Sequence, residues 1–486
     1  MLWRHYIGLL FIFFISCSST ELGKSGGTSL RKGDPQVVLL HFSDFHSHLL
    51  PSKDALGGLA KIATIIKKER AAAGGRTDVV VVASGDLVEK GSSACKATKD
   101  IACVQLLHEI GLDYSALGNN ELYRGGQDLN KLVKESGVTW INENVKGLSS
   151  QAWNNHVLFK GAKSGLEFWL LSWTRTPFWD AAAAKKNSFK FTGNPTAANW
   201  ADWKRLAAKA PLLWVNHLPW SQDQIFATSA CENIPNKNLA FLSGDDHKAQ
   251  FANFCAPLYD SAAFGETVTK LVIGSDASGK NLQTKSVDVI SVNSSVEEDS
   301  ETQTKINSLY AKYSPKAREV VANVSQEVTS KKLALWIAQS YLYASKGDVA
   351  IVNSGAIKSS LNPGTITWED LTIAAPYNND VMGLDWSKDN LEKSICQASL
   401  RKKDEDGADY GSELILAGAK LIDPGTDHCR LELPSHKKAL KVIMDSYMVS
   451  RSARWLGRDV SGVSFRFGFN TEKAIEMGLK RSGGVF

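Results

Sequence analysis

The sequence predicts two layered domains of mixed helix and strand, an α/β domain over residues 35–295 and an α+β domain over residues 326–486, and three observations support this. The chain has 486 residues, whereas single hydrophobic cores rarely grow past about 250–300 residues. Short apolar runs in the first half alternate with stretches of helical periodicity, which is typical of strand–helix–strand units. Between the halves, residues 296–305 are acidic and polar. We therefore expect a linker at residues 296–325, and the apolar spacing over residues 306–324 predicts that it is partly helical.

Four apolar runs in the first domain predict buried strands, at residues 37–42, 79–83, 212–215 and 239–242. Helical spacing at residues 59–66 separates the first two runs. Each run is followed at once by polar residues, which are Ser43-Asp44-Phe45-His46, Ser84-Gly85-Asp86, Asn216-His217 and Gly244-Asp245-Asp246-His247. Function collects at strand ends in layered sheets of this kind, so we expect the functional site at this edge.

The second domain opens with a different pattern. Residues 333–343 have helical spacing, residues 349–352 form a buried strand, and loops containing Gly and Pro follow at residues 353–364. This order predicts a separate α+β domain.

The charge balance argues against a nucleic-acid polymer as partner. The 56 basic and 51 acidic residues give a net charge of +5 and are spread along the chain with no long basic block. Hydrophobic residues at 43% and charged residues at 22% are near the average of globular proteins.

The amino terminus predicts export. Arg4 and His5 precede an apolar run at residues 7–15 that is too short to span a bilayer and resembles the core of a signal peptide. The Phe-Ile-Ser-Cys sequence that ends at Cys17 resembles a bacterial lipobox, whose cysteine becomes the lipidated first residue. We therefore expect residues 1–17 to be a lipoprotein-type signal and residues 18–34 a flexible tether. The protein would then be a periplasmic or outer-membrane lipoprotein, held on the membrane by its lipid. The alternative is an ordinary cleaved signal, with Cys17 discarded.

Six further cysteines fit three disulfides in an oxidising compartment. Proximity in sequence favours the pairs Cys95 with Cys103, Cys231 with Cys255, and Cys396 with Cys429. Fifteen pairings are possible for six cysteines, and the sequence alone does not choose among them. Zinc binding by these thiols is less expected, because no CxxC spacing occurs.

The polar strand ends carry donors suited to divalent metal ions. Asp44 and His46 are two residues apart, so on an extended chain both side chains leave the same face. The other candidates are Asp86, Asn119 of the segment Gly118-Asn119-Asn120-Glu121, His217, Asp245 and His247. Oxygen and imidazole donors of this kind bind Mn, Fe, Co or Zn. A lone Asp-x-His is more often turn chemistry, but four apolar strands that each end in a potential ligand are hard to obtain by chance.

These blocks resemble the calcineurin-like metallophosphoesterases, whose D-x-H, G-D, G-N-H-E, H and G-H-x-H blocks have counterparts here in the same order. The 5'-nucleotidase branch is the most similar. The resemblance implies a four-layer α/β/β/α sandwich and two divalent ions (Mn, Zn, Mg, Fe or Co). It also implies the ligands Asp44, His46, Asp86, Asn119, His217 and His247, with Asp86 bridging the ions.

The chain departs from the family pattern at two places in this domain. Asp245 stands where the family has the first histidine of G-H-x-H, and a retained carboxylate ligand would favour harder ions such as Mn or Mg over Zn. Asn120 replaces the catalytic histidine of G-N-H-E, and Tyr123 replaces its partner aspartate. An amide can donate hydrogen bonds but cannot deliver a proton at neutral pH.

The resemblance extends into the second domain. Residues 348–358, 364–367 and 376–379 look like three blocks of the 5'-nucleotidase substrate domain, which implies a nucleotide or other small phosphate ester as substrate. Asn353 belongs to the first block, and Lys358 replaces the arginine that grips phosphate, which keeps the charge but loses the bidentate fork. Tyr447 is the candidate for one of the two aromatic rings that hold the nucleobase in the family.

Two hypotheses follow. The first is a hydrolase in which two metal ions generate a hydroxide and clamp the phosphoryl oxygens, and the second is a surface-anchored binding protein that kept the fold after losing the catalytic histidine. Bound metal together with hydrolysis of an activated aryl phosphate would discriminate between them. Several tryptophans, including Trp173, Trp179, Trp214 and Trp220, could line a ligand cleft or simply pack in the core.

Overall fold

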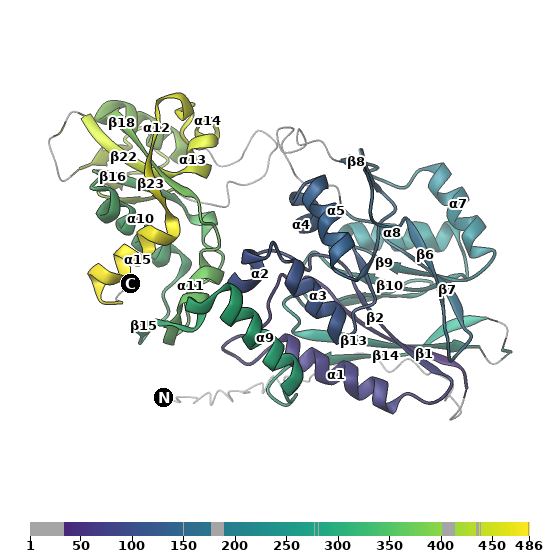
Figure 1. The fold of residues 1–486 in the computed structure, drawn as a ribbon. Helices are drawn as coiled ribbons and strands as arrows, with labels where there is room; N and C mark the ends of the chain where they lie inside the picture. Colours follow the sequence, from purple (N-terminus) through teal and green to yellow (C-terminus); the bar gives the residue numbers. More distant parts are fainter. Residues whose placement is uncertain are drawn as a thin grey trace, which may run out of the picture.

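A computed structural model of the chain describes residues 34–148, 150–175, 189–276, 278–279, 281–400, 414–433, 437, 439–484 and 486. They form two lobes, one drawn mainly in purple to teal and the other mainly in green to yellow (Figure 1). The signal, the tether up to residue 33 and Trp179 lie outside the described residues. Within the described part of the chain, no helix has both the length and the apolar character that crossing a membrane requires.

The first domain contains two six-stranded sheets. The order in the first sheet is β14 (Leu282–Ser291), β13 (Thr267–Ser275), β1 (Gln36–Phe42), β2 (Thr77–Ala83), β3 (Tyr114–Ala116) and β4 (Thr139–Ile141). The order in the second is β11 (Gln250–Asn253), β12 (Pro257–Asp260), β10 (Asn238–Ser243), β9 (Leu212–Val215), β7 (Glu167–Leu171) and β6 (His156–Lys160). All four strands expected from apolar runs are present, as β1, β2, β9 and β10.

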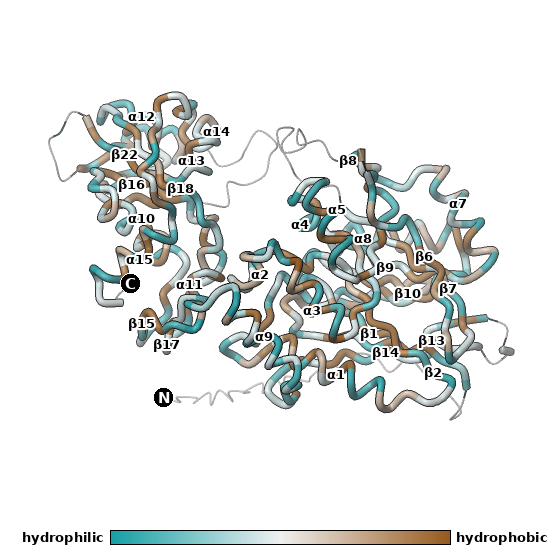
Figure 2. Tube along the Cα trace, viewed as in Figure 1, coloured by the Kyte–Doolittle hydropathy of each residue, from teal (hydrophilic) through white to brown (hydrophobic). Residues whose placement is uncertain are grey.

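Alternation along β1 sorts its side chains between two cores. Leu40 and Phe42 pack with the helices α1 (Leu59–Ala72), α3 (Ile101–Ile110), α5 (Gly126–Glu135) and α9 (Ser300–Tyr313). Val37 and Leu39 pack instead against the inner face of the second sheet. The outer face of that sheet is covered by α7 (Ala197–Ala207) and α8 (Trp220–Asn233) around a cluster of tryptophans. The interior strands are the brown, hydrophobic parts of the trace in Figure 2. The predicted four-layer α/β/β/α sandwich is therefore confirmed.

The second domain has a five-stranded sheet between two layers of helices. Its order is β19 (Leu414–Ala417), β16 (Val349–Asn353), β22 (Ala439–Asp445), β18 (Asp380–Ser387) and β23 (Phe465–Asn470). Ala350 and Val352 of β16 pack under α10 (Ser330–Ser345) and α15 (Thr471–Ser482). Val349 and Ile351 pack under α12 (Lys388–Leu400), α13 (Ser446–Ser450) and α14 (Ser452–Leu456). The α+β prediction is confirmed.

The remaining elements are short. They are the helices α2 (Ser93–Ala97), α4 (Asn119–Tyr123) and α11 (Trp368–Ala374), the 3-10 turns η1 (Pro315–Arg318), η2 (Ser354–Ala356) and η3 (Ser461–Val463), and the strands β5 (Val145–Gly147), β8 (Phe189–Phe191), β15 (Val320–Val324), β17 (Gly364–Thr367), β20 (Lys420–Ile422) and β21 (Arg430–Glu432).

The helix expected over residues 306–324 ends earlier, at Tyr313. Pro315 lacks an N–H and disfavours helical backbone at the residue before it, so the chain turns there. The β-branched residues that follow form β15, which pairs with β17 of the second domain. The prediction of helix at residues 320–324 was therefore wrong, whereas α9 buries Ile306 and Tyr310 in the first core.

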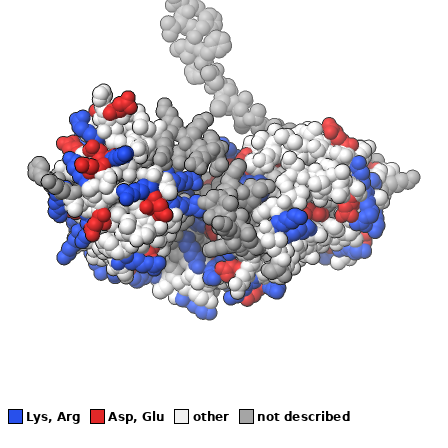
Figure 3. Space-filling model, turned by 90° about the horizontal axis from the view of Figure 1, so that it is seen from above, with Lys and Arg blue, Asp and Glu red and all other residues white. Residues whose placement is uncertain are grey.

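The three cysteine pairs favoured by proximity are all bonded: Cys95 with Cys103, Cys231 with Cys255, and Cys396 with Cys429. Disulfides of this number are typical of proteins in oxidising compartments. On the face drawn in Figure 3, basic and acidic side chains are interspersed, in keeping with the net charge of +5.

Candidate metal centre and its surroundings

The predicted metal ligands converge from both sheets of the first domain. Asp44 and Asp86 follow β1 and β2 of one sheet, and His217 follows β9 of the other. Asp245 and His247 follow β10, next to β9. Five of these candidates have φ between 47° and 106°: Asp44, His46, Asp86, Asp245 and His247. Left-handed backbone at non-glycine residues is uncommon and collects at functional sites.

Two groups of side chains are close enough to hold a metal ion each. Asp44, His46 and His247 form one group, and Asp44, Asp86 and His217 form the other, with candidate ligand atoms within 4.8 Å of one another in each. Asp86 also lies between the groups, because its Oδ2 is 3.8 Å from His46 Nε2 and its Oδ1 is 3.5 Å from His217 Nε2. Asp44 therefore belongs to both groups, and Asp86 belongs to one and lies beside the other.

Hydrogen bonds at Nδ1 orient the rings of His46 and His217 so that Nε2 faces the other candidate ligands. His46 Nδ1 is 3.2 Å from Val88 O, and His217 Nδ1 is 2.7 Å from Ser84 O. A carbonyl only accepts, so Nδ1 of each ring carries a proton and Nε2 is the ring atom that faces the other candidate ligands. The two Nε2 atoms of His46 and His247 lie 3.1 Å apart. Together with Asp44, the two rings are close enough to bind one shared cation.

The charge state of Asp44 fits the same conclusion. Burial alone would raise its pKa, but the neighbouring imidazoles of His247, His217 and His46 hold the pKa below its ordinary value. Asp44 Oδ2 accepts from the backbone N–H of Asp245 at 3.0 Å, whereas Oδ1 is buried and accepts no hydrogen bond. A buried carboxylate oxygen without a donor is costly. A divalent cation at this point would satisfy it.

Asp245 has an ion-pair partner that the sequence did not reveal. Arg175 Nη1 donates to Asp245 Oδ2 at 2.7 Å, and Asp245 Oδ1 lies 3.4 Å from His217 Nε2. The pKa of Asp245 is lowered, because the hydrogen bonds and charges of His217 and Arg175 outweigh its burial. Arg175 follows β7 in the second sheet, so its strand-end position was the only signal in the sequence.

Asn120 lies beside the metal centre but binds Asp86. Its backbone N–H donates to Asp86 Oδ1 at 2.8 Å, and its side-chain amide donates to Asp86 Oδ2. Asn119 Oδ1 is 3.2 Å from His217 Nε2, as expected for a ligand of the second group. Tyr123, in the aspartate position of the family, is 45% exposed. The chain thus places an amide that orients Asp86 where the family has an acid.

Close packing around Asp86 requires glycine at position 118. A Cβ on Gly118 would lie 2.1 Å from Asp86 Oδ1, which is far inside contact distance. The carboxylate of Glu121 holds the same turn, since it accepts from the backbone N–H groups of Asp86, Leu87 and Gly118 at 3.0, 2.8 and 2.7 Å. The sequence pattern alone did not indicate this structural role of Glu121.

A buried carboxylate supports the strand end that carries His217. Asp223 Oδ1 accepts from the side-chain amide of Asn216 at 2.9 Å, and Asn216 Oδ1 accepts from the backbone N–H of Trp173 at 3.0 Å. Burial raises the pKa of Asp223 to about 7, against hydrogen bonds from Ser243 and Asn216. Asp223 was also missed from the sequence.

The candidate substrate residues of the second domain lie near its boundary with the first. Lys358 Nζ donates to Gly355 O at 2.7 Å and lies 5.3 Å from the centre of the Tyr377 ring. Burial, and then the charge of Glu89 from the first domain, raise the pKa of Tyr377. Asn353 Oδ1 accepts from Gly355 N at 2.8 Å.

Tyr447 is on α13, 40% exposed, with the Arg451 guanidinium 5.4 Å from its ring centre. No hydrogen bond or ion pair described for Tyr447, Lys358 or Asn353 reaches the metal groups.

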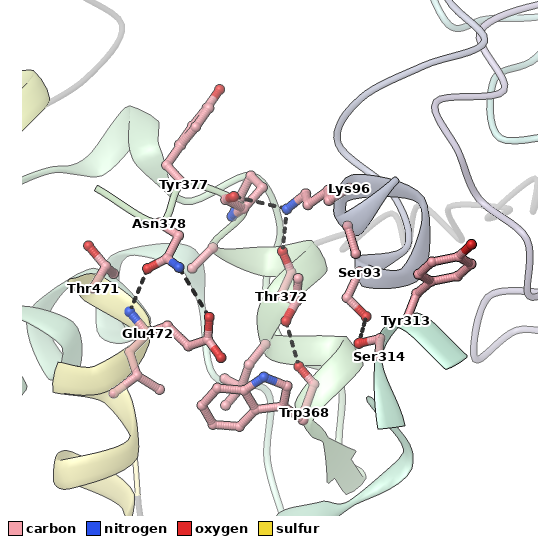
Figure 4. Close-up of a pocket in the computed structure, with 15 residues that line it drawn as sticks. Ser93, Lys96, Tyr313, Ser314, Trp368, Thr372, Tyr377, Asn378, Thr471 and Glu472 are labelled. Atoms are coloured by element: carbon pink, nitrogen blue, oxygen red, sulfur yellow. Dashed lines mark hydrogen bonds between the residues drawn. The ribbon is translucent and has the colours of Figure 1, made fainter. Parts of the chain in front are cut away.

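The two domains meet at α2. Glu369 of α11 accepts from Ser93 Oγ at 2.5 Å and from the Tyr310 hydroxyl. Lys96 Nζ donates to Pro376 O at 2.9 Å and to Thr372 O at 3.4 Å. A cavity of about 390 Å³ lies beside these contacts, lined by residues of both domains (Figure 4).

The sequence profile of the calcineurin-like phosphoesterases matches residues 37–249, and that of the 5'-nucleotidase C-terminal domain matches residues 310–474. The chain is a two-domain member of this phosphoesterase and 5'-nucleotidase family. The members of the first profile are phosphoesterases, and both metal groups lie at positions that the profile covers.

The individual relatives of this chain are distant from it in sequence. The 5'-nucleotidase of Bos taurus is 22% identical over 502 residues, which cover 85% of this chain and 83% of the relative. The endonuclease YhcR of Bacillus subtilis is 22% identical over 436 residues, but they span only 34% of its length. Among solved structures, the 5'-nucleotidase precursor of Thermus thermophilus has a TM-score of 0.68 at 16% identity, covering 93% of this chain and 97% of that one. That likeness concerns the fold.

Proposed function

We propose that this phosphoesterase is exported, binds two divalent metal ions, and hydrolyses phosphate esters or anhydrides of the nucleotide type. The observation that carries the proposal is the pair of buried ligand groups that share Asp44, with Asp86 between them. Two ions so held would generate a hydroxide nucleophile and neutralise the phosphoryl oxygens.

The residues of the chain would position this chemistry. His46 and His217 are oriented by their Nδ1 hydrogen bonds, and Asp86 is oriented by both donors of Asn120. Asp245 would complete the ligand set of the second group, with its charge offset by Arg175. Lys358 of the second domain would bind either the phosphate, on the side away from the metal ions, or the rest of the substrate.

The leaving group sets the substrate preference. Asn120 supplies no proton, so a leaving oxygen that needs protonation should depart slowly, by a factor of about 10²–10⁴. Phosphoanhydrides and aryl esters leave as weakly basic anions, which metal ions alone can stabilise. They should be better substrates than alkyl esters such as nucleoside monophosphates.

Metal content and a leaving-group series test this proposal together. We expect about two divalent ions per chain in metal-loaded protein, loss of both in Asp86→Ala, and no loss in the control Asp202→Ala, whose carboxylate pairs with Arg205 on α7. Rates over a series of phosphate esters should fall steeply as the leaving group becomes more basic. Absence of metal from the loaded wild type, or equal rates for adenosine monophosphate and an aryl phosphate, would contradict it. Hydrolysis of nothing at all would favour a binding protein.

Anchoring through a lipid on Cys17 is part of the proposal and rests on the sequence alone. Mass spectrometry of the amino-terminal peptide should find a diacylglyceryl-modified Cys17 as the first residue. An unmodified start at another residue would reject the anchor and leave the enzymatic proposal intact.

A further inference from the structure

A second cavity, which we call the tryptophan pocket, opens in the first domain. Its volume is about 560 Å³, within the range of small-molecule sites. The wall is largely apolar and includes Trp173, Trp200, Leu218 and Phe226. Ile225 also lines the pocket and is 68% exposed, so it lies at the mouth.

The tryptophan pocket adjoins the candidate metal centre. Leu218 of its wall follows the metal candidate His217 directly, and the backbone N–H of Arg175 donates to His217 O at 2.8 Å. Arg175 also lines the pocket, while its Nη1 is bonded to Asp245. One arginine therefore separates the pocket from the metal ligands.

The chemistry of the wall defines what the pocket can accept. Arg175 is the only charged side chain described in its lining, and Asp245 neutralises it. Indole and phenyl faces bind flat, uncharged rings through apolar burial and ring stacking. Gln222 and Ser229 add hydrogen-bonding groups for a polar edge.

We propose that the tryptophan pocket receives the aromatic leaving group of a phosphate ester whose phosphoryl group is held at the metal centre. This inference rests on the proposed function and narrows its substrate class to aryl phosphates or similar esters. It agrees with the role of Asn120, because an aryl oxide leaves without protonation. In the reaction, the oxygen of water bonds to phosphorus while the bond between phosphorus and the aryl oxygen breaks, giving inorganic phosphate and an aryl oxide that takes up a proton from water.

Substitutions at the mouth test the pocket without touching the metal ligands. Ile225→Arg should raise KM for 2-naphthyl phosphate by about tenfold or more, since an apolar contact of this size is worth that factor. The kcat/KM for pyrophosphate, which has no ring, should change less than about twofold. Val463→Arg, at a position 67% exposed in the second domain, is the matched control. Ser229→Phe, which fills the pocket, should reproduce the loss if Ile225→Arg misfolds.

Binding supplies a readout that needs no catalysis. 2-Naphthol should quench tryptophan fluorescence of the metal-free wild type, and this quenching should be lost in Ile225→Arg. The inference is overturned if the naphthyl ester keeps its KM in both pocket variants while pyrophosphate is still hydrolysed. If the metal-loaded wild type hydrolyses neither compound, the proposed function fails. The binding of 2-naphthol then tests by itself whether the pocket accepts an aromatic ring.

Discussion

Arg175 Nη1 lies 2.7 Å from Asp245 Oδ2, although the two residues are 70 positions apart and come from different strand ends. Asp245 stands where the family has a histidine, so a neutral side chain is replaced by an anionic one beside the candidate metal groups. The guanidinium of Arg175 restores the charge balance beside the metal groups. The two positions therefore have to be considered as one unit.

This coupling predicts non-additive effects on stability. Asp245→His alone should lower the free energy of unfolding, because it removes the carboxylate that Arg175 Nη1 binds and places an imidazole beside the guanidinium. Adding Arg175→Leu should recover about 0.5–3 kcal/mol, the usual coupling between residues in contact. Urea unfolding of the wild type, both single variants and the double variant measures this. Additive effects would show that the pair is incidental.

A second prediction concerns the acid that Asn120 does not supply. Asn120→His with Tyr123→Asp should raise the rate for alkyl phosphomonoesters by about 10²–10⁴ and change aryl esters much less. The slope of rate against leaving-group basicity should flatten accordingly. Tyr123→Asp alone is the control, and it should leave the slope unchanged. An unchanged slope in the double variant would mean that another group already acts as acid, with His48 the first to test.

The close packing of Gly118 against Asp86 predicts that no larger residue is tolerated at position 118 without moving Asp86. In Gly118→Ala the new methyl would meet Asp86 Oδ1 at 2.1 Å, so Asp86 must move away from His46 and His217. We expect metal content to fall and the thermal midpoint to drop. Gly75→Ala is the matched control, because its Cβ would meet nothing within 4 Å. Full metal occupancy in Gly118→Ala would show that the turn can relax without cost to the site.

Asp223 predicts a pH dependence of stability. Its pKa of about 7 in the folded chain is above the ordinary aspartate value, so between pH 4 and 7 the folded state binds more protons than the unfolded state. The stability contributed by protonated Asp223 is complete at low pH and lost as the pH rises through about 7.

The variant Asp223→Asn does not titrate and keeps an oxygen for Asn216. Relative to wild type, its free energy of unfolding should therefore rise with pH over this window, by roughly 2–4 kcal/mol in metal-free protein. Denaturant unfolding at pH 5 and pH 8 measures the difference. A difference that does not change with pH would mean that Asp223 is ionised in the folded chain.

The disulfides predict both a thiol count and a stability effect. Denatured, unreduced protein should expose no titratable thiol other than an unmodified Cys17. Replacing Cys231 and Cys255 by Ser should lower the free energy of unfolding by about 3 kcal/mol, as expected for closing a loop of this length. Two or more further thiols in the unreduced protein would contradict the pairing.

The parts of the site that the sequence predicted are those carried by strand ends. Asp44 and Asp86 follow apolar runs, and neighbouring parallel strands bring their carboxyl ends to one edge. Their convergence with His217 follows from the face-to-face packing of the two sheets. Backbone order and apolar periodicity suffice for that much.

The hydrogen-bond and ion-pair partners of the polar side chains cannot be predicted from apolar periodicity. Asn120 could donate to a substrate or to Asp86, and only the tertiary structure places it on Asp86. The pairing of Arg175 with Asp245 is equally invisible along the chain. Trp173 and Trp214 are both buried in one core cluster, and of the two only Trp173 also lines the tryptophan pocket.

The five residues of helix α2 are bonded both to the second domain and to α3. Its Ser93 and Lys96 are bonded to the second domain, and its Cys95 is bonded to Cys103 in α3. The backbone of α2 continues from the loop that begins at Asp86. A reorientation of the second domain must therefore either break these bonds or move α2 with it. A movement of α2 would displace the loop that begins at Asp86, beside both metal groups. The Cys95–Cys103 disulfide thus fixes to α3 the same helix that carries the contacts with the second domain.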